Sequence, residues 1–232
     1  MKEATITFGA GNGLVGTLSL PSAQPGASPR AGVLLFNAGI VHRVGPHRIN
    51  VTIARELAAQ GIPALRFDLA GHGDSARPSG AYSFEAQAVI DLRSAMDALA
   101  AAAKVERFVI FGYCSGAYHA YAAALEDERI AGLLMYDAYR YPTLKTHINY
   151  YLDRLRAPGL GARLTGALRN ALAPSARSEE SEPPQAPELG RINFYPAKED
   201  VGAGLRRLVD RGLCIRMIYS GGDLRHYNYQ NQ

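Results

Sequence analysis

Cysteine is scarce in this sequence, and tryptophan is absent. The two cysteines, Cys114 and Cys214, stand far apart with no second cysteine close to either, which argues against a disulfide framework or a zinc site. A reduced, cytoplasmic setting fits this usage best. No stretch reaches the roughly 18 apolar residues that a membrane-spanning helix needs, and the N-terminus carries no basic segment followed by an apolar run. We therefore expect neither a membrane span nor export.

The charge of the chain is modest and evenly spread. Its 25 basic and 21 acidic residues give a net charge of +4, and the basic residues form no stripe with interleaved aromatics. Nucleic acid is therefore not an expected partner. With 47% hydrophobic and 20% charged residues over 232 positions, the chain has enough apolar side chains for one core and is not of the disordered type.

Short apolar runs alternate with segments of helical periodicity. Ile49, Ile53 and Leu57 recur at four-residue spacing before Gly61, and Ser83 precedes a helix whose apolar residues share one face. Strands that alternate with helices favour parallel pairing through right-handed crossovers. The sequence thus predicts an α/β fold with a doubly wound, mostly parallel sheet. The expected strands are 5–8, 14–19, 32–36, 63–67, 107–111, 132–136 and 213–219, and further helices are expected over 115–125 and 202–210.

The sharpest local motif is GYCSG, residues 112–116, between an expected strand and an expected helix. A nucleophile at the apex of such a turn has a strained backbone, and the two glycines allow the strand and the helix to approach closely. The helix N-terminus favours the thiolate, so Cys114 is predicted to be reactive. Cys214 lies within an apolar strand and is predicted to be buried and inert. The alternative for Cys114 is that it packs as a small hydrophobic residue.

With two further motifs, this turn resembles the α/β-hydrolase superfamily, in the capped branch that includes monoacylglycerol-lipase-like and serine-aminopeptidase-like enzymes. Residues 37–40 (NAGI) follow a strand where the family has its His-Gly oxyanion loop, and residues 67–75 (FDLAGHGDS) resemble its D-x-x-G-H-G-x-S turn. Cysteine replaces the usual serine at position 114, as in the G-Y-C-x-G turn of dienelactone hydrolases, and Asn37 replaces the usual histidine.

The resemblance implies a helical cap inserted into the hydrolase core. Residues 1–142 and 201–232 would form the core and 143–200 the cap, with the Ser-, Glu- and Pro-rich stretch 175–187 as a mobile loop. Only nine residues follow Asp223, whereas the family continues with a strand, a histidine and a helix. We therefore expect the C-terminal strand and helix to be missing from this chain.

By the same resemblance, the chain is a hydrolase or acyl transferase whose Cys114 attacks an ester or thioester and forms an acyl-enzyme. The backbone amides of Ile40 and Ser115 would bind the oxyanion. No metal ion or organic cofactor is implied. A dienelactone-hydrolase-like lactonase is one alternative, and a non-catalytic hydrolase-fold protein that binds an acyl ligand or a partner is another.

The resemblance places the triad acid after the last expected strand, at Asp223, with Asp137 as the alternative. The catalytic histidine is expected beyond residue 232, and His226 is the candidate for this role within the chain. His72 belongs to the G-H-G turn and His119 to the helix after Cys114, so structural roles are expected for both.

The substrate is expected to be a small acyl compound, including one linked to a carrier or to coenzyme A. Arg43, shortly after the oxyanion loop, could bind a carboxylate or a phosphate, and Tyr139, where the cap leaves the sheet, could line an apolar cleft. A solvated loop and core packing are the respective alternatives. A missing last strand would leave 213–219 at a sheet edge, which favours self-association, so a homodimer stays open.

Overall fold

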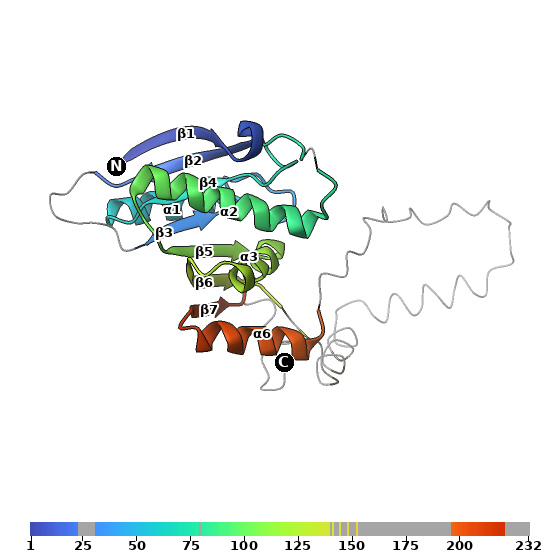
Figure 1. Cartoon of the computed structure of the whole chain (residues 1–232). Coiled ribbons are helices and arrows are strands. Elements are labelled where there is room, and N and C mark those ends of the chain that lie inside the picture. Colours follow the sequence, from blue (N-terminus) through green and yellow to red (C-terminus); the bar gives the residue numbers. More distant parts are fainter. Residues whose placement is uncertain are drawn as a thin grey trace, which may run out of the picture. The chain divides into compact units, whose positions relative to one another are not determined.

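The part of the chain that the structure describes is built on a seven-stranded sheet (Figure 1). The computed structural model describes residues 1–22, 31–78, 80–139, 141, 144, 148, 152 and 196–220. Met1–Tyr139 and Ala197–Ser220 together form one compact unit. The strands of its sheet are β1 (Lys2–Phe8), β2 (Leu14–Leu20), β3 (Gly32–Leu35), β4 (Ala64–Phe67), β5 (Phe108–Tyr113), β6 (Ile130–Tyr136) and β7 (Cys214–Ile218).

The order of the strands is β1-β2-β4-β3-β5-β6-β7. Neighbours from β4 to β7 pair in parallel, whereas β1 and β2 form an antiparallel hairpin that joins β4 in antiparallel pairing. Leu34, Leu35, Leu65 and Ile110 in the central strands are fully buried, as expected for parallel strands that are covered on both faces. The predicted doubly wound, mostly parallel α/β sheet is confirmed.

Helices cover both faces of this sheet. Ala54 of the first helix packs with Val33 and Leu35 of β3. Gly32 of the same strand faces the second helix, because a Cβ built on it would lie 2.6 Å from the side chain of Leu99. Successive side chains of a strand point to opposite faces, so these two helices lie on opposite sides. The described helices are α1 (Ile49–Ala59), α2 (Phe84–Ala103), α3 (Ser115–Glu126) and α6 (Lys198–Asp210), with 3-10 turns η1 (Ala10–Asn12) and η2 (Pro46–Arg48).

Helix α2 illustrates how local sequence sets these elements. The side chain of Ser83 accepts a hydrogen bond from the N–H of Ala86 at 3.3 Å, which satisfies one of the free amides at the helix N-terminus. The apolar stripe of the helix faces the sheet, and Leu92, Met96 and Leu99 are all fully buried. The N-cap residue Ser83 and the buried apolar face of α2 both agree with the sequence prediction.

The parallel topology brings several chemically interesting loops to one edge of the sheet. The carboxyl ends of β3, β4, β5 and β6 all point to this edge, since these strands are parallel neighbours. The loop at 36–45, the turn at 68–78, Cys114 and Asp137 directly follow these four strands. Ligands of open α/β sheets bind outside the carboxyl ends of the strands, so the candidate site is sought there.

The prediction that Cys214 is buried is wrong, because this residue is exposed. It opens β7, which stands at the end of the strand order and pairs with β6 on one side. Met217 and Ile218 of the same strand are 38% and 43% exposed. The apolar sequence of β7 correctly indicated a strand, but burial depends on what covers it, which local sequence does not reveal.

The predicted cap at 143–200, including the stretch 175–187, lies for the most part outside the described residues, as does the chain after Ser220. Of the helices that the structure describes, none combines the length and the apolar character that crossing a membrane would require.

Candidate active site

Cys114 lies at the tip of a tight turn between β5 and α3. Its backbone has φ 53° and ψ −119°, a region that residues with a side chain rarely occupy. Two hydrogen bonds hold this conformation: the Cys114 N–H donates to the carbonyl of Tyr136 at 2.8 Å, and the Ala117 N–H donates to the carbonyl of Cys114 at 3.0 Å. Cys114 is exposed and directly precedes the first turn of α3. This geometry is the one that the GYCSG motif predicts.

Gly112 and Gly116 make the close packing around this turn sterically feasible. A Cβ built on Gly112 would lie 2.6 Å from the Cα of Ala117, and one built on Gly116 would lie 2.7 Å from the backbone oxygen of Asn37. Both neighbours are backbone atoms, so a larger residue would force α3 away from β5 or the loop after β3 away from α3. The two glycines therefore fix Cys114 relative to that loop.

Asn37, at the position of the usual histidine, anchors the loop after β3. It is 2% exposed. Its Nδ2 donates to the carbonyl of Val41 at 2.7 Å and to Oδ1 of Asp68 at 2.9 Å, and its Oδ1 accepts the N–H of Leu69 at 2.6 Å. Because the amide side chain is both donor and acceptor, Asn37 joins the loop to the end of β4 in a way that a carboxylate could not.

The same loop contacts the turn of Cys114, residues 112–116, which is called the elbow below, through Gly39. The Gly39 N–H donates a hydrogen bond to Oγ of Ser115, with an N···O distance of 2.7 Å. Ile40 follows directly, and its side chain is 91% exposed. The structure thus brings the amide of Gly39 to the residue after Cys114, while the role of the Ile40 and Ser115 amides as oxyanion donors stays a prediction.

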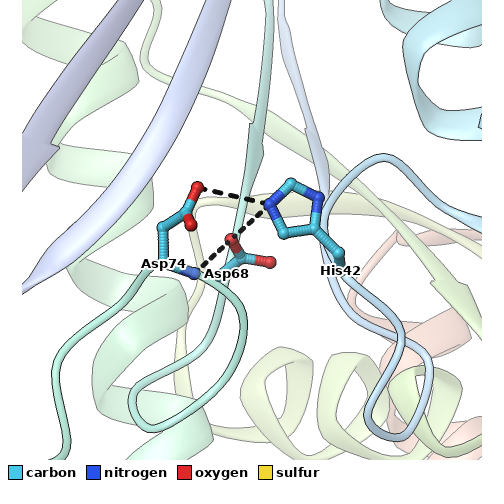
Figure 2. Close-up of side chains that lie close together, drawn as sticks. All are labelled: His42, Asp68 and Asp74. Carbon is cyan, nitrogen blue, oxygen red and sulfur yellow. Dashed lines mark hydrogen bonds and ion pairs between the residues drawn. The ribbon is translucent and has the colours of Figure 1, made fainter.

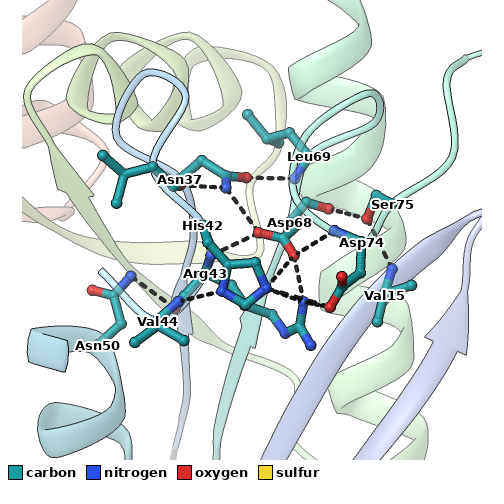
Figure 3. A network of polar contacts seen from close by, with 11 residues as sticks. Val15, Asn37, His42, Arg43, Val44, Asn50, Asp68, Leu69, Asp74 and Ser75 are labelled. Atoms are coloured by element: carbon teal, nitrogen blue, oxygen red, sulfur yellow. Dashed lines mark hydrogen bonds and ion pairs between the residues drawn. The ribbon is translucent and has the colours of Figure 1, made fainter. Parts of the chain in front are cut away.

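Asp68 is the centre of a polar network beside the site (Figure 3). Its side chain is fully buried and accepts hydrogen bonds from the N–H of Arg43 at 2.6 Å, from Arg43 Nη1 at 2.5 Å and from the N–H of Asp74 at 3.2 Å. Ser75 Oγ donates to the Asp68 carbonyl at 2.7 Å and accepts the Val15 N–H at 2.9 Å. These contacts tie the loop after β3, the turn after β4 and the start of β2 into one unit.

His42, Asp68 and Asp74 point toward one another (Figure 2), and one donor atom of each lies within 4.8 Å of the others, a spacing that would suit a metal ion. A side-chain cation already fills this place. Nη1 of Arg43 lies 2.5 Å from Asp68 Oδ2, 2.7 Å from Asp74 Oδ2 and 2.8 Å from His42 Nε2.

Burial acts to lower the pKa of the Arg43 guanidinium, but its hydrogen bonds to Asp74 and Asp68 raise that pKa overall. The group therefore stays charged and neutralises the buried carboxylate. A metal ion would have to displace it, so these residues do not fit a resident metal. The guanidinium joins the two loops as an internal cation.

Two residues that were predicted to contact a substrate make packing contacts. Arg43 is 8% exposed and is held by the carboxylates described above. Tyr139 is also 8% exposed, and its ring centroid lies 4.6 Å from that of Tyr118 and 5.5 Å from that of Tyr121. Its carbonyl accepts a hydrogen bond from the hydroxyl of Tyr219 at 3.0 Å. For Tyr139 these contacts favour the core-packing alternative, whereas buried Arg43 does not lie in the solvated loop that was its alternative. Direct contact of either residue with a substrate stays a prediction.

Asp137, the alternative acid, lies at the same sheet edge as Cys114. It follows β6 with φ 49° and is 8% exposed. Its N–H donates to the carbonyl of Ile218 at 2.8 Å, and its Oδ1 accepts the N–H of Ser220 at 2.7 Å. Burial raises the pKa of Tyr113, the last residue of β5, and the nearby Asp137 acts in the same direction. The structure therefore places a carboxylate one strand away from the elbow.

The favoured acid Asp223 and the candidate histidine His226 lie outside the described residues. His119 is 3% exposed, and burial lowers its pKa from 6.5 to about 4. Its ring packs edge-on against Phe84 at 5.0 Å, and Phe84 in turn contacts the ring of His72 at 5.2 Å. These contacts agree with the structural roles expected for His72 and His119.

Sequence reasoning did not single out Asp68, Asp74 or Gly39. Asp68 carried a signal, since it directly follows a short apolar strand and the family-like turn begins there. Gly39 lies in the loop 37–40 that resembles the oxyanion loop, but its own contact with Ser115 was not expected, because the two residues are 76 positions apart. Such pairs arise only when two loops meet at one edge of the folded sheet.

Solved structures with a similar fold share little sequence with this chain. The hypothetical protein PA2218 from Pseudomonas aeruginosa has a TM-score of 0.50 and 20% identity, over 64% of this chain and 45% of its own. The alpha/beta hydrolase GrgF from Penicillium sp. sh18 has a TM-score of 0.45 and 22% identity, and the match covers 72% of this chain and 56% of GrgF. A third structure is XC6422 from Xanthomonas campestris, described as a serine hydrolase without lid. It has a TM-score of 0.46 and 22% identity, and the match covers 59% of this chain and 61% of XC6422. The chain thus spans between 45% and 61% of the length of these proteins.

No curated protein matches the sequence. A model of the alpha/beta hydrolase family, in contrast, matches residues 33–226. This range contains the loop of Asn37, the turn of Asp68 and the elbow of Cys114, which the structure brings to one sheet edge in the topology described above. Since the match extends over well more than half of the sequence, the chain belongs to the alpha/beta hydrolase family.

Proposed function

We propose that this protein is a hydrolase or acyl transferase that uses Cys114 as its nucleophile on an ester or a thioester. The observation that carries the proposal is the elbow, in which an exposed cysteine occupies a strained backbone conformation directly before a helix. Strain of this kind costs stability and persists at functional sites. The alternative, in which Cys114 packs as a small hydrophobic residue, does not account for its exposure.

The chemistry proceeds in two steps. The Cys114 thiolate attacks the acyl carbonyl carbon, a C–S bond forms, and the carbonyl electron pair moves to oxygen. When the carbonyl reforms, the bond to the alcohol or thiol breaks, and the leaving group departs with the electron pair and takes up a proton from water. Water or another acceptor then attacks the resulting thioester, which releases the acyl group and restores the thiol. The partial positive charge at the N-terminus of α3 favours both the thiolate and the oxyanion.

The surroundings of Cys114 favour an uncharged acyl group. Ile40 is 91% exposed and Val41 is 38% exposed on the loop that contacts the elbow. Arg43, a cation on the same loop, is bound to Asp68 and Asp74, so an acidic group on the acyl chain would compete with two carboxylates of the protein. A small apolar acyl compound, including one linked to a carrier or to coenzyme A, is the substrate that we propose.

We further propose that the protein belongs to the capped branch of the family, that it works in the cytoplasm and that it self-associates. The two free cysteines, both exposed, support a reducing compartment. The exposed side chains of Met217 and Ile218 on β7 support association through this strand.

The test is acylation by p-nitrophenyl acetate at mildly alkaline pH. Release of p-nitrophenolate reports the rate, and peptide mapping by mass spectrometry locates the acetyl group. We expect one acetyl group on Cys114 in the wild-type protein and none at this position in Cys114→Ala. Cys214→Ala is the matched control, because it removes the other exposed thiol, and it should acylate at the wild-type rate. Equal acylation rates in Cys114→Ala and the wild type, or acetyl found mainly on Cys214, would contradict the proposal.

A further inference from the structure

Ser115 has a polar side chain although it is not the N-cap residue of α3, which is Cys114. It is the first residue of α3, so its own N–H has no partner within the helix. Its Oγ accepts the hydrogen bond from the Gly39 N–H at 2.7 Å. A hydroxyl that accepts one hydrogen bond still has its own proton to donate. Ser115 therefore offers two donors, an amide and a hydroxyl, beside Cys114.

The position of these two donors decides what they can bind. The Ser115 amide is the predicted donor to the oxygen of the attacked carbonyl, and the hydroxyl belongs to the same residue. Helical side chains lean toward the N-terminus of their helix, so the hydroxyl of this first residue lies at the same end of α3 as the amide. The hydrogen bond from Gly39 withdraws electron density from Oγ, which makes its O–H a stronger donor because hydrogen bonds in a chain reinforce one another.

We propose, on the basis of the function proposed above, that the Ser115 hydroxyl is a catalytic residue that donates a hydrogen bond to the oxyanion. When the Cys114 sulfur bonds to the carbonyl carbon, the negative charge that develops on oxygen is bound by the Ser115 O–H as well as by backbone amides. The Gly39 N–H acts through Ser115, since it orients and polarises the hydroxyl. This hydrogen bond shortens as charge develops and therefore lowers the barrier more than it strengthens substrate binding.

The test compares two reactions of the same sulfur. Acylation by p-nitrophenyl acetate passes through an oxyanion, whereas alkylation by iodoacetamide displaces iodide at a CH₂ carbon and forms none. Ser115→Ala should lower the acylation rate of Cys114 by about 10²-fold, the effect of removing one oxyanion donor. The rate of alkylation should stay within about twofold of the wild type, because the thiolate and the helix N-terminus are unchanged. Ser115→Thr keeps the hydroxyl and should recover most of the acylation rate.

A matched control removes a hydroxyl elsewhere. Thr52 lies on α1, and its Oγ1 donates to the carbonyl of Arg48 at 3.3 Å; Thr52→Ala should leave both rates unchanged. An acylation rate in Ser115→Ala at or above the wild-type value would overturn the inference, as would an equal loss in both reactions, which indicates a displaced elbow. In these cases acylation of Cys114 still stands. If the wild-type protein is alkylated at Cys114 but never acylated, the proposed function itself fails and the inference fails with it.

Discussion

Replacement of Arg43 by methionine should destabilise the protein strongly, because it removes the internal cation from the Asp68 carboxylate. Asp68 is 0% exposed, and Arg43 Nη1 contacts its Oδ2 at 2.5 Å. Methionine keeps the approximate length and apolar body of the side chain but not its charge. Three N–H donors, from Asn37, Asp74 and the backbone of residue 43, would still bind the carboxylate, but its charge would be uncompensated. Breaking a buried ion pair in this way costs about 3–5 kcal/mol.

The assay is urea unfolding at neutral pH, with Arg55→Met as the matched control. Arg55 pairs with Glu3 at 2.7 Å at the protein surface, so its loss should shift the midpoint far less. The double variant Arg43→Met with Asp68→Asn removes both charges. It should be more stable than the sum of the two single losses predicts, by about 2 kcal/mol, because a neutral amide needs no cation. A midpoint for Arg43→Met equal to that of Arg55→Met, or additive losses in the double variant, would refute this account of the network.

Two further predictions concern α3. Gly116→Ala should destabilise the fold by about 1–3 kcal/mol and slow acylation of Cys114, because the new Cβ would lie 2.7 Å from the Asn37 carbonyl oxygen. Urea unfolding measures the stability, and release of p-nitrophenolate measures the acylation rate. An unchanged urea midpoint would contradict the close packing. The pKa of His119 is about 4 in the folded state, below its ordinary value of 6.5. Between these two values the unfolded state binds more protons, so stability rises with pH across this window. Wild-type protein should therefore lose about 2 kcal/mol from this residue between about pH 7 and about pH 5. In His119→Phe this loss should be absent, and an identical pH dependence of the two proteins would show that His119 is already free to protonate.

The elements near the elbow could be predicted because their causes are local. Buried parallel strands need continuous apolar runs, which residues 32–35 and 108–111 supply, and the sharp turn to α3 needs glycines at 112 and 116. Ser83 caps α2 through a contact three residues away. In each case the residues that cause the structure are neighbours in the sequence, so the pattern can be interpreted without knowledge of the fold.

The role of Arg43 could not be predicted in this way. Its position after the oxyanion loop suggested a cation for the substrate, whereas its partners Asp68 and Asp74 lie 25 and 31 residues further along the chain. Only the parallel pairing of β3 with β4 brings the two loops together. The same separation hid the internal cation at the place where His42 and the two carboxylates would otherwise form a metal site.

The sequence by itself determined the fold class, the order of most strands and helices along the chain, and the placing of Cys114 in a nucleophile elbow, because hydrophobic periodicity, caps and glycine turns act over a few residues. The tertiary structure alone decided that Cys214 is exposed at the sheet edge, that Arg43 is an internal cation, and that the Gly39 amide meets the Ser115 hydroxyl across 76 residues. Burial and polar pairing of this kind depend on which strands become neighbours, and the order of strands in space differs from their order in the sequence.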